Sequence, residues 1–351
     1  MLLRATLPPH HGISQFSFSS FPSSCYFSQS PAAILFRAVK AKSVDGVLRL
    51  RPIALSSRSL PVASHALGSH AGTSGNIVSE TSSSNIMDES SLLIVGPGVL
   101  GKLVAEKWQQ DYPGCHIFGQ TMTTEHHDDL VKLGIKPSLS GRSERVYPNI
   151  IFCAPPSRTT DYPGDVRVAL SNWNGEGSFL FTSSTAVYDC NDEQLCDEDY
   201  PVVPIGRSPR TDVLLKAESA VLEAGGCVLR LVGLYSADRG AHVYYLKKGV
   251  VDVHPDGILN LIHYEDAASL AIAIMKRKLR SRIFLGCDNN PISRKEIMDC
   301  VNRSGKYSGK FDGFTGNTDK PGKKMNNSKT RAEIGWEPKY SSFSHFLDQV
   351  S

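Results

Sequence analysis

One stretch of this sequence constrains the fold more than any other, the segment Ser91–Gly101, which reads SLLIVGPGVLG. Four consecutive apolar residues, Leu92–Val95, predict a strand of the fully buried kind that parallel sheets contain. The strand leads directly into the spacing G-x-G-x-x-G at residues 96–101, and a helical pattern follows over Val99–Gln110. The segment therefore predicts the first strand, turn and helix of a nucleotide-binding α/β sheet.

Each glycine of this turn has a physical role if a dinucleotide binds here. Gly96 permits the tight turn, Gly98 lets the backbone approach a pyrophosphate, and Gly101 lets the helix pack on the strand. The first N–H groups of the helix, those of Val99 and Leu100 among them, point toward the anion at the positive end of the helix dipole. We predict these five residues as cofactor-binding. The alternative is a glycine-rich turn that has lost its binding site.

The second predicted strand, residues 116–121, bears on the choice of cofactor. A carboxylate at its end would bind a ribose 2′-hydroxyl and indicate NAD. The chain has Gln120, Thr121 and Met122 there, so nothing repels a 2′-phosphate, and no arginine is placed to bind one. We predict Thr121 as a cofactor contact and leave the choice open between NAD and NADP, with a preference for NADP.

Two further buried strands end in candidate site residues. Strand 149–154 ends at Ala154 and Pro155, which we expect to border the nicotinamide ribose, although a rigid Pro-Pro turn explains the pattern equally well. Strand 178–183 leads into SSTAVY, where the hydroxyls of Ser183 and Ser184 could hold a cofactor or a substrate carbonyl. Serines also occur in such loops for turn geometry alone.

The rest of the chain extends the α/β pattern and then changes it. We expect a helix over residues 211–224 and one continuous strand over 227–235, followed by mixed short elements. The fold class is therefore α/β, with a doubly wound (Rossmann) parallel sheet over 89–235 and a smaller C-terminal α+β substrate-side portion over 236–351. We interpret the acidic segment 189–200 and the basic run 320–331 as solvated surface, and we expect no nucleic-acid partner.

The N-terminal residues 1–85 have a different composition from the rest. Residues 1–79 contain seven Lys and Arg against a single acid, Asp45, and are rich in serine. This pattern is typical of a disordered organelle transit peptide, and the serine content favours import into the chloroplast stroma. A mitochondrial location and a cytoplasmic protein with a disordered tail are the alternatives. The apolar runs are too short to predict a membrane span.

Eight cysteines are scattered along the chain without a C-x-x-C spacing. No histidine lies at metal-ligand spacing from them. We therefore expect no metal site and no disulfide framework.

The order of these motifs resembles the extended short-chain dehydrogenase/reductase superfamily, of the NAD-dependent epimerase/dehydratase type, and is most similar to its atypical YeeZ-like members. The resemblance covers residues 91–348 and rests on the glycine turn together with CAPP, SSTAVY, VLRLVGLY, LIHYEDAA and IGWEPKY. It implies a Rossmann fold, an NAD(P) cofactor and a small-molecule substrate. It also implies that Ser184 is the catalytic serine that hydrogen-bonds the reacting substrate oxygen.

The sequence departs from the family at the catalytic Tyr-x-x-x-Lys pair. With Glu218 as the register mark, the two positions fall at Arg210 and Leu214, and neither side chain can replace its counterpart. Tyr188 is then the candidate for a substitute proton donor, and Arg210 the candidate for an electrophile. The sequence thus predicts an atypical oxidoreductase or epimerase-like enzyme. The alternative is a non-catalytic NAD(P)-binding scaffold or redox sensor in the plastid, and a ketopantoate reductase-like protein ranks last.

Overall fold

The computed structural model describes residues 87–190, 194–318 and 322–349. The predicted transit segment lies outside these described residues. Among the described residues, no helix has both the length and the apolar character that crossing a membrane requires.

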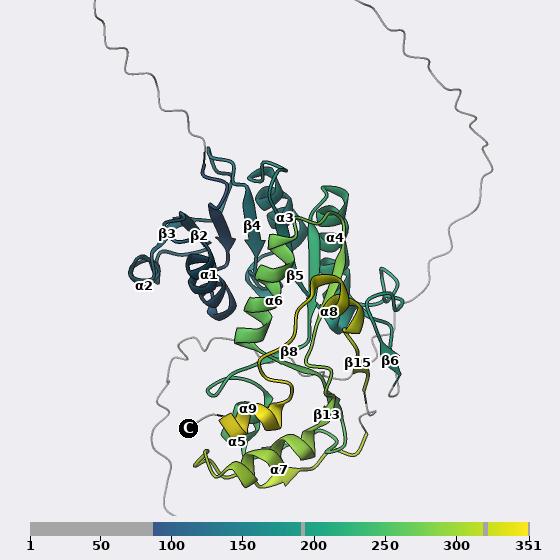
Figure 1. Cartoon of the computed structure of the whole chain (residues 1–351). Coiled ribbons are helices and arrows are strands. Elements are labelled where there is room, and N and C mark those ends of the chain that lie inside the picture. The colour runs from purple at the N-terminus through teal and green to yellow at the C-terminus, as the bar shows by residue number, and fades with distance from the viewer. Residues whose placement is uncertain (1–86, 191–193, 319–321, 350–351) are drawn as a thin grey trace, which may run out of the picture. The chain divides into compact units, whose positions relative to one another are not determined.

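The centre of the structure is a seven-stranded sheet in the order β12-β7-β5-β4-β1-β2-β3 (Figure 1). Its strands are β1 (Leu92–Val95), β2 (Ile117–Thr121), β3 (Ile135–Leu139), β4 (Asn149–Phe152), β5 (Phe179–Ser184), β7 (Cys227–Leu231) and β12 (Ile283–Gly286). Every neighbouring pair is parallel. The chain proceeds from β1 outward to β3 and then returns to β4 on the other side of β1. This reversal confirms the predicted doubly wound sheet and places its switch point between β1 and β4.

Helices cover both faces of the sheet. One face carries α1 (Val99–Asp111) and α6 (Tyr264–Lys276), and the other carries α3 (Tyr162–Ser171) and α4 (Pro209–Glu223). Successive residues of β1 point to opposite faces, so Leu92 and Ile94 pack in the core with α1 and α6, while Leu93 and Val95 pack with α3 and α4. A short helix, α2 (His127–Lys132), precedes the edge strand β3.

The prediction of one continuous strand over residues 227–235 is wrong, because the segment divides into two strands. Val232 N–H still bonds to Gly286 O of the central sheet, whereas Gly233 N–H bonds to Asn260 O. The chain therefore changes partner, and β8 (Gly233–Tyr235) pairs with β11 (Leu261–His263) instead of continuing the central sheet.

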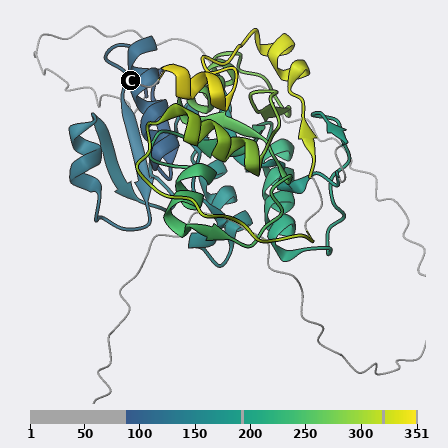
Figure 2. The same ribbon diagram turned by 90° about the horizontal axis from the view of Figure 1, so that it is seen from below.

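The smaller C-terminal portion is built from short elements, most of which lie beyond one end of the central sheet (Figures 1 and 2). Its helices are α5 (Ala241–Lys248), α7 (Arg294–Ser304), α8 (Ser328–Ile334) and α9 (Phe343–Gln349). Its strand pairs are β9 (Val250–Val251) with β14 (Gly313–Phe314) and β10 (Ile258–Leu259) with β13 (Ile292–Ser293). Its strand β15 (Lys324–Met325) pairs with β6 (Leu195–Cys196), which comes before α4 in the chain. Helix α7 begins with a complete capping box between Ser293 and Glu296.

The interpretation of segments 189–200 and 320–331 as solvated surface is wrong for several of their residues. Glu198 is buried, and its carboxylate accepts hydrogen bonds from Thr330 N (2.8 Å) and Thr330 Oγ1 (2.6 Å). Asn327 and Thr330 are also buried. The pairing of β6 with β15 brings the acidic and basic segments together. Asn327 Nδ2 also donates to Cys287 O at 2.9 Å, and Thr330 Oγ1 accepts from Leu285 N at 2.9 Å, so contacts with β12 and the residue after it help to bury these side chains.

Candidate functional site

The glycine turn between β1 and α1 has the geometry that its sequence predicts. Gly96 has φ +78°, and a Cβ there would lie 2.6 Å from Ala154 Cα. Its N–H donates to Gln120 O of β2 at 2.9 Å. Only glycine fits this position, because both the backbone conformation and the contact with Ala154 exclude a side chain. The turn and the end of β4 are therefore in direct contact.

Gly101 and Gly98 lack side chains for different reasons. A Cβ on Gly101 would lie 2.9 Å from Ile94 Cγ2, so this glycine is needed for the packing of α1 on β1. Gly98 is exposed, and its nearest neighbour would be Gly96 O at 4.0 Å. It is the N-cap of α1 and no side chain caps the helix there. Packing does not require glycine at position 98. The absence of a side chain there leaves open space above the helix N-terminus, and helix N-termini in general are suited to binding anions.

The residues after Gly98 contribute to this site through the backbone. Val99 is half-buried, and the Leu100 side chain packs in the core beneath α1. Both lie in the first turn of the helix, where N–H groups have no partner within the helix itself. The two residues can therefore contact a bound anion through their amides.

Thr121 ends β2 beside the turn, but its hydroxyl already has protein partners. Thr121 Oγ1 lies 2.7 Å from Thr123 O and 2.7 Å from His127 Nε2. The neighbouring Gln120 is buried and donates to Gly141 O at 3.2 Å. The polar groups at the end of this strand thus include an imidazole that the sequence analysis did not single out.

Ala154 and Pro155 follow β4 as predicted, at the same edge of the sheet as the glycine turn. The Tyr162 hydroxyl of α3 donates to Ala154 O at 2.8 Å. Pro155 is exposed and precedes a short 3-10 turn, η1 (Pro156–Arg158). The tyrosine contact fixes the path of the backbone where it leaves the sheet.

The two serines at the end of β5 point to opposite faces and differ in their bonding. Ser183 is buried, and its Oγ donates to Glu218 Oε1 of α4 at 2.5 Å. Ser184 is half-buried, and its Oγ accepts from Ala186 N at 3.2 Å at the start of η2 (Thr185–Val187). The Ser184 O–H has no acceptor within the described part of the chain. Ser184 can therefore donate to a ligand oxygen, whereas Ser183 is engaged inside the protein.

Tyr188 lies in the core behind this turn. Its side chain is 2% exposed, and its hydroxyl is 3.3 Å from Glu198 O, to which it donates. Arg230 lies over the ring at 4.7 Å. Burial raises the pKa of Tyr188 to about 12, although the Arg230 charge acts in the opposite direction. In this arrangement Tyr188 lacks the solvent access that a proton donor to a substrate needs.

Helix α4 presents neither member of the Tyr-x-x-x-Lys pair of the superfamily that the sequence resembles. Arg210 is exposed in its first turn, and Leu214 is buried in the core against α3 and β5. The helix begins at Pro209 after Ser208, two residues earlier than predicted. No tyrosine or lysine of α4 therefore lies at the two positions expected for the pair.

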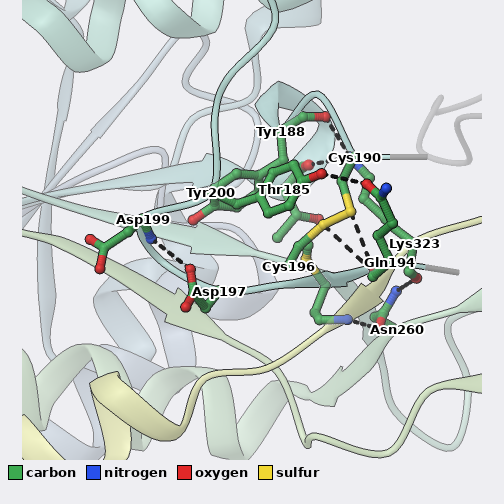
Figure 3. The surroundings of a disulfide bond; sticks show 11 residues. Thr185, Tyr188, Cys190, Gln194, Cys196, Asp197, Asp199, Tyr200, Asn260 and Lys323 are labelled. Atoms are coloured by element: carbon green, nitrogen blue, oxygen red, sulfur yellow. Dashed lines mark hydrogen bonds between the residues drawn. A yellow bond between two sulfur atoms is a disulfide. The ribbon is translucent and has the colours of Figure 1, made fainter. Parts of the chain in front are cut away.

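A lysine absent from the predicted site residues lies beside the SSTAVY turn. Lys323 Nζ donates to Thr185 O at 2.8 Å and to Tyr188 O at 3.0 Å (Figure 3). Burial lowers the pKa of this ammonium group to about 8, and the negative charge of Asp189 partly opposes the shift. Lys323 is 138 residues from Thr185 in the sequence, inside a run of basic residues, so no local pattern identifies it.

A disulfide lies next to this lysine and was not predicted. Cys190 and Cys196 are joined, with their Cα atoms 6.5 Å apart (Figure 3). Cys190 follows the SSTAVY turn, and Cys196 belongs to β6, which pairs with β15 beside Lys323. The other described cysteines are free, and the described residues include no cluster of three or more His, Cys, Asp or Glu suited to a metal.

These features define the class of the protein: a Rossmann-type α/β fold with an open glycine turn at its switch point. No protein-family model matches the sequence, and no curated protein matches it. Solved structures do. A conserved protein from Silicibacter pomeroyi, described as functionally unknown, aligns with a TM-score of 0.61 at 20% identity, over 74% of this chain and 96% of that one.

Two enzymes with known substrates have the same architecture. dTDP-glucose 4,6-dehydratase from Bacillus anthracis, solved in complex with NAD, gives a TM-score of 0.61 at 14% identity over 74% of this chain and 94% of that one. UDP-glucose 4-epimerase from Thermotoga maritima, solved with UDP-glucose, gives a TM-score of 0.59 at 13% identity over 73% of this chain and 96% of that one. The fold is thus the one that the resemblance predicted, that of NAD-dependent epimerases and dehydratases.

Proposed function

We propose that this chain binds NAD or NADP at the turn of residues 96–101 and acts as an atypical oxidoreductase or epimerase-like enzyme on a small-molecule substrate. The proposal rests on the exposure of Gly98 and on its position as the N-cap of α1. Gly98 caps α1 without a side chain, and the packing of the protein leaves open space around it. Such a position suits a pyrophosphate that approaches the backbone closely.

The residues around the turn have separate tasks in this proposal. The amides of Val99, Leu100 and Gly101 hold the pyrophosphate, and Thr121 and Ala154–Pro155 border the two ribose positions. When bound, the nicotinamide would supply or accept a hydride. Ser184 donates its free O–H to the substrate oxygen, which favours the polarised carbonyl form. Ser183 supports this site indirectly through Glu218.

The alternative function is a non-catalytic NAD(P)-binding scaffold or redox sensor. A specific observation favours it, because α4 carries an exposed arginine and a buried leucine where the family's proton relay is expected. General acid–base catalysis typically contributes on the order of 10²–10⁴ in rate. A chain without this pair turns over slowly, uses another proton donor, or has kept only the binding.

Titration of the purified protein with NADH and NADPH tests what both candidates share. We expect saturable quenching of tryptophan fluorescence or enhancement of nicotinamide fluorescence. Absence of saturable binding of either nucleotide below millimolar concentration would reject both candidates.

A screen of aldehydes, ketones and nucleotide sugars for cofactor oxidation separates the two candidates. The enzyme predicts turnover that Ser184→Ala reduces, while Ser171→Ala, an exposed serine at the end of α3, leaves it unchanged. Turnover unaffected by Ser184→Ala would remove this residue from the mechanism. No turnover with demonstrated NAD(P) binding would favour the sensor.

We infer further that the protein works in the chloroplast stroma, with a mitochondrial or cytoplasmic location as the alternatives. The inference rests on the basic, acid-poor and serine-rich composition of residues 1–79. Fusion of residues 1–85 to a fluorescent reporter tests it, and we expect plastid fluorescence. A diffuse cytosolic signal would overturn the inference.

A further inference from the structure

Lys323 reaches the site from a distant part of the chain and holds both ends of one turn. The turn η2 follows Ser184 directly, and Lys323 Nζ donates to the carbonyl of its first residue, Thr185, and to the carbonyl of Tyr188 just after it. Inside the turn, Tyr188 N–H bonds to Thr185 O at 3.2 Å. The ammonium group therefore bridges the two backbone carbonyls that bracket the turn.

The backbone that carries Lys323 is itself held from two sides. Asn260 Nδ2 donates to Lys323 O at 2.8 Å, and Asn260 Oδ1 accepts from Met325 N at 2.7 Å. On the other side, Lys324 N donates to Gln194 O at 3.0 Å, as part of the pairing of β15 with β6. The backbone from which the Lys323 side chain extends is therefore anchored on both sides, and the ammonium group is held by its own bonds to Thr185 O and Tyr188 O.

The environment of Lys323 differs from that of an ordinary paired lysine. It forms no salt bridge with a carboxylate of the described residues. Asp189, whose charge does reach it, is already paired with Arg207. Two of its three N–H groups bond to Thr185 O and Tyr188 O, and the third has no acceptor in the described part of the chain. Burying a cation whose only hydrogen-bond partners are backbone carbonyls costs desolvation free energy, because carbonyls do not neutralise its charge. Such a contact therefore contributes little to the stability of the fold.

Ser184 is the N-cap of the turn that Lys323 holds. The Ser184 hydroxyl accepts from Ala186 N inside η2, so a displaced turn displaces the hydroxyl that is free to donate. We propose that Lys323 is the positioning residue for Ser184, because it holds the turn whose Ala186 N–H bonds to the serine hydroxyl. The proposal rests on the proposed enzymatic function for its catalytic consequence, but the contact itself can be tested independently.

Hydrogen exchange measured by mass spectrometry tests the contact without reference to activity. In full-length Lys323→Met, we expect a peptide spanning Ser184–Tyr188 to exchange about tenfold faster than in the wild type, the order expected for loss of charge-assisted hydrogen bonds. Lys323→Arg keeps a cation with several donors and is expected to restore most of the protection. Unchanged exchange in Lys323→Met would overturn the proposal.

Lys329→Met is the matched control for these experiments. Lys329 belongs to the same C-terminal segment, but its ammonium group is half-exposed and pairs with Asp197 and Asp199. We expect no change in exchange over Ser184–Tyr188 in this variant. An equal increase in both lysine variants would show a general loosening of the segment and would overturn the specific role of Lys323. Circular dichroism confirms that each variant is folded.

Steady-state kinetics with the substrate found in the screen tests the catalytic consequence. We expect kcat of Lys323→Met to fall about tenfold or more while the dissociation constant of NAD(P) stays within about twofold, because the turn and not the glycine loop is affected. A kcat equal to that of the wild type would overturn the positioning role. If the wild type turns over no substrate, the proposed function fails while the exchange experiment still decides the contact.

The pH profile adds a readout that a merely structural lysine would not change. Wild-type kcat is expected to decline above about pH 8, as the Lys323 ammonium group loses its proton. Burial lowers the pKa of Lys323, and Asp189 is the described ionisable group whose charge opposes this shift, while Asn260 and the disulfide on the adjoining elements do not ionise. In Lys323→Arg the decline should move to higher pH, because a guanidinium group stays charged. An identical profile in the two proteins would contradict the proposal.

Discussion

Glu218 and Arg230 form a buried ion pair between α4 and β7, with 2.7 Å between Glu218 Oε2 and Arg230 Nη2. Their side chains are 3% and 5% exposed. The Glu218 carboxylate also accepts from Ser183 Oγ, and the Arg230 guanidinium lies over the Tyr188 ring. The pair thus connects α4 to the end of β5 and, through the Tyr188 ring, to the turn that follows Ser184.

Removing one partner of this pair should be more harmful than removing both. We expect Arg230→Met to lower the free energy of unfolding by about 3–5 kcal/mol, because the Glu218 carboxylate then stays buried without a counter-charge. Glu218→Gln combined with Arg230→Met should cost less than the single Arg230 variant. Urea unfolding of the two single variants and the double variant measures the coupling. Additive effects of the two substitutions would show that the pair is not energetically coupled.

The glycines of the turn should separate folding from binding. Gly96→Ala is expected to lower the free energy of unfolding by about 3 kcal/mol, because it forces both a left-handed backbone conformation and a 2.6 Å contact with Ala154. Gly98→Ala meets open space and should cost less than about 1 kcal/mol. If a pyrophosphate approaches here, Gly98→Ala weakens NADH or NADPH binding, measured by fluorescence titration. Equal affinity in Gly98→Ala and wild type would place the nucleotide elsewhere.

The parts of the structure that could be predicted from the sequence are those encoded locally. The apolar run Leu92–Val95 with its glycine turn, and the similar runs that precede Ala154 and Ser184, each predict a strand and its end without knowledge of the rest. Parallel strands bring their carboxyl ends to one edge, so the position of the candidate site follows. The fold and the edge that carries the site were therefore predictable.

The remaining features depend on contacts between distant segments. Lys323 meets Thr185 beside the pairing of β15 with β6, and strands of two residues leave no periodic signal in a sequence. The acidic run around Glu198 predicts a solvated side chain, and only the distant Thr330, which donates to its carboxylate, shows that it is buried. Arg230 interrupts an apolar strand, and its partner Glu218 is known only once α4 packs on the sheet. Patterns within one element cannot contain this information.

Reduction of the Cys190–Cys196 disulfide should loosen the region that carries β6. The bond joins residues six apart, and closing a loop of this size is worth about 2 kcal/mol in the chain-entropy model. We expect dithiothreitol to lower the free energy of unfolding by this order, and to increase hydrogen exchange in residues 194–200. Cys190→Ser combined with Cys196→Ser should reproduce the effect and abolish the response to the reductant. A wild-type protein unaffected by dithiothreitol would show that the bond does not stabilise the fold.

Asp288 should make stability decrease as the pH rises toward neutrality. It follows β12 at 5% exposure, and its Oδ2 has no hydrogen-bond partner in the described part of the chain. Burial raises the pKa of Asp288 to about 7, above the value of about 3.9 for an unfolded aspartate. Between these values the native state binds more protons than the unfolded state, so stability is greatest below about pH 4 and is lost as the pH rises through about 7.

Comparison of Asp288→Asn with the wild type isolates this contribution, because both proteins share every other titrating group. Two buried histidines have the opposite effect on stability. Burial lowers the pKa of His242 and of His263 to about 4, so their contribution to the free energy of unfolding increases as the pH rises. Asparagine keeps the oxygen that accepts from Asn290 N at 2.9 Å. We therefore expect the difference in unfolding free energy between variant and wild type to move in favour of the variant from pH 4 to pH 8, by about 1.4 kcal/mol per unit of pKa shift. Urea unfolding at several pH values measures this difference, and a difference independent of pH would show that Asp288 ionises normally in the folded protein.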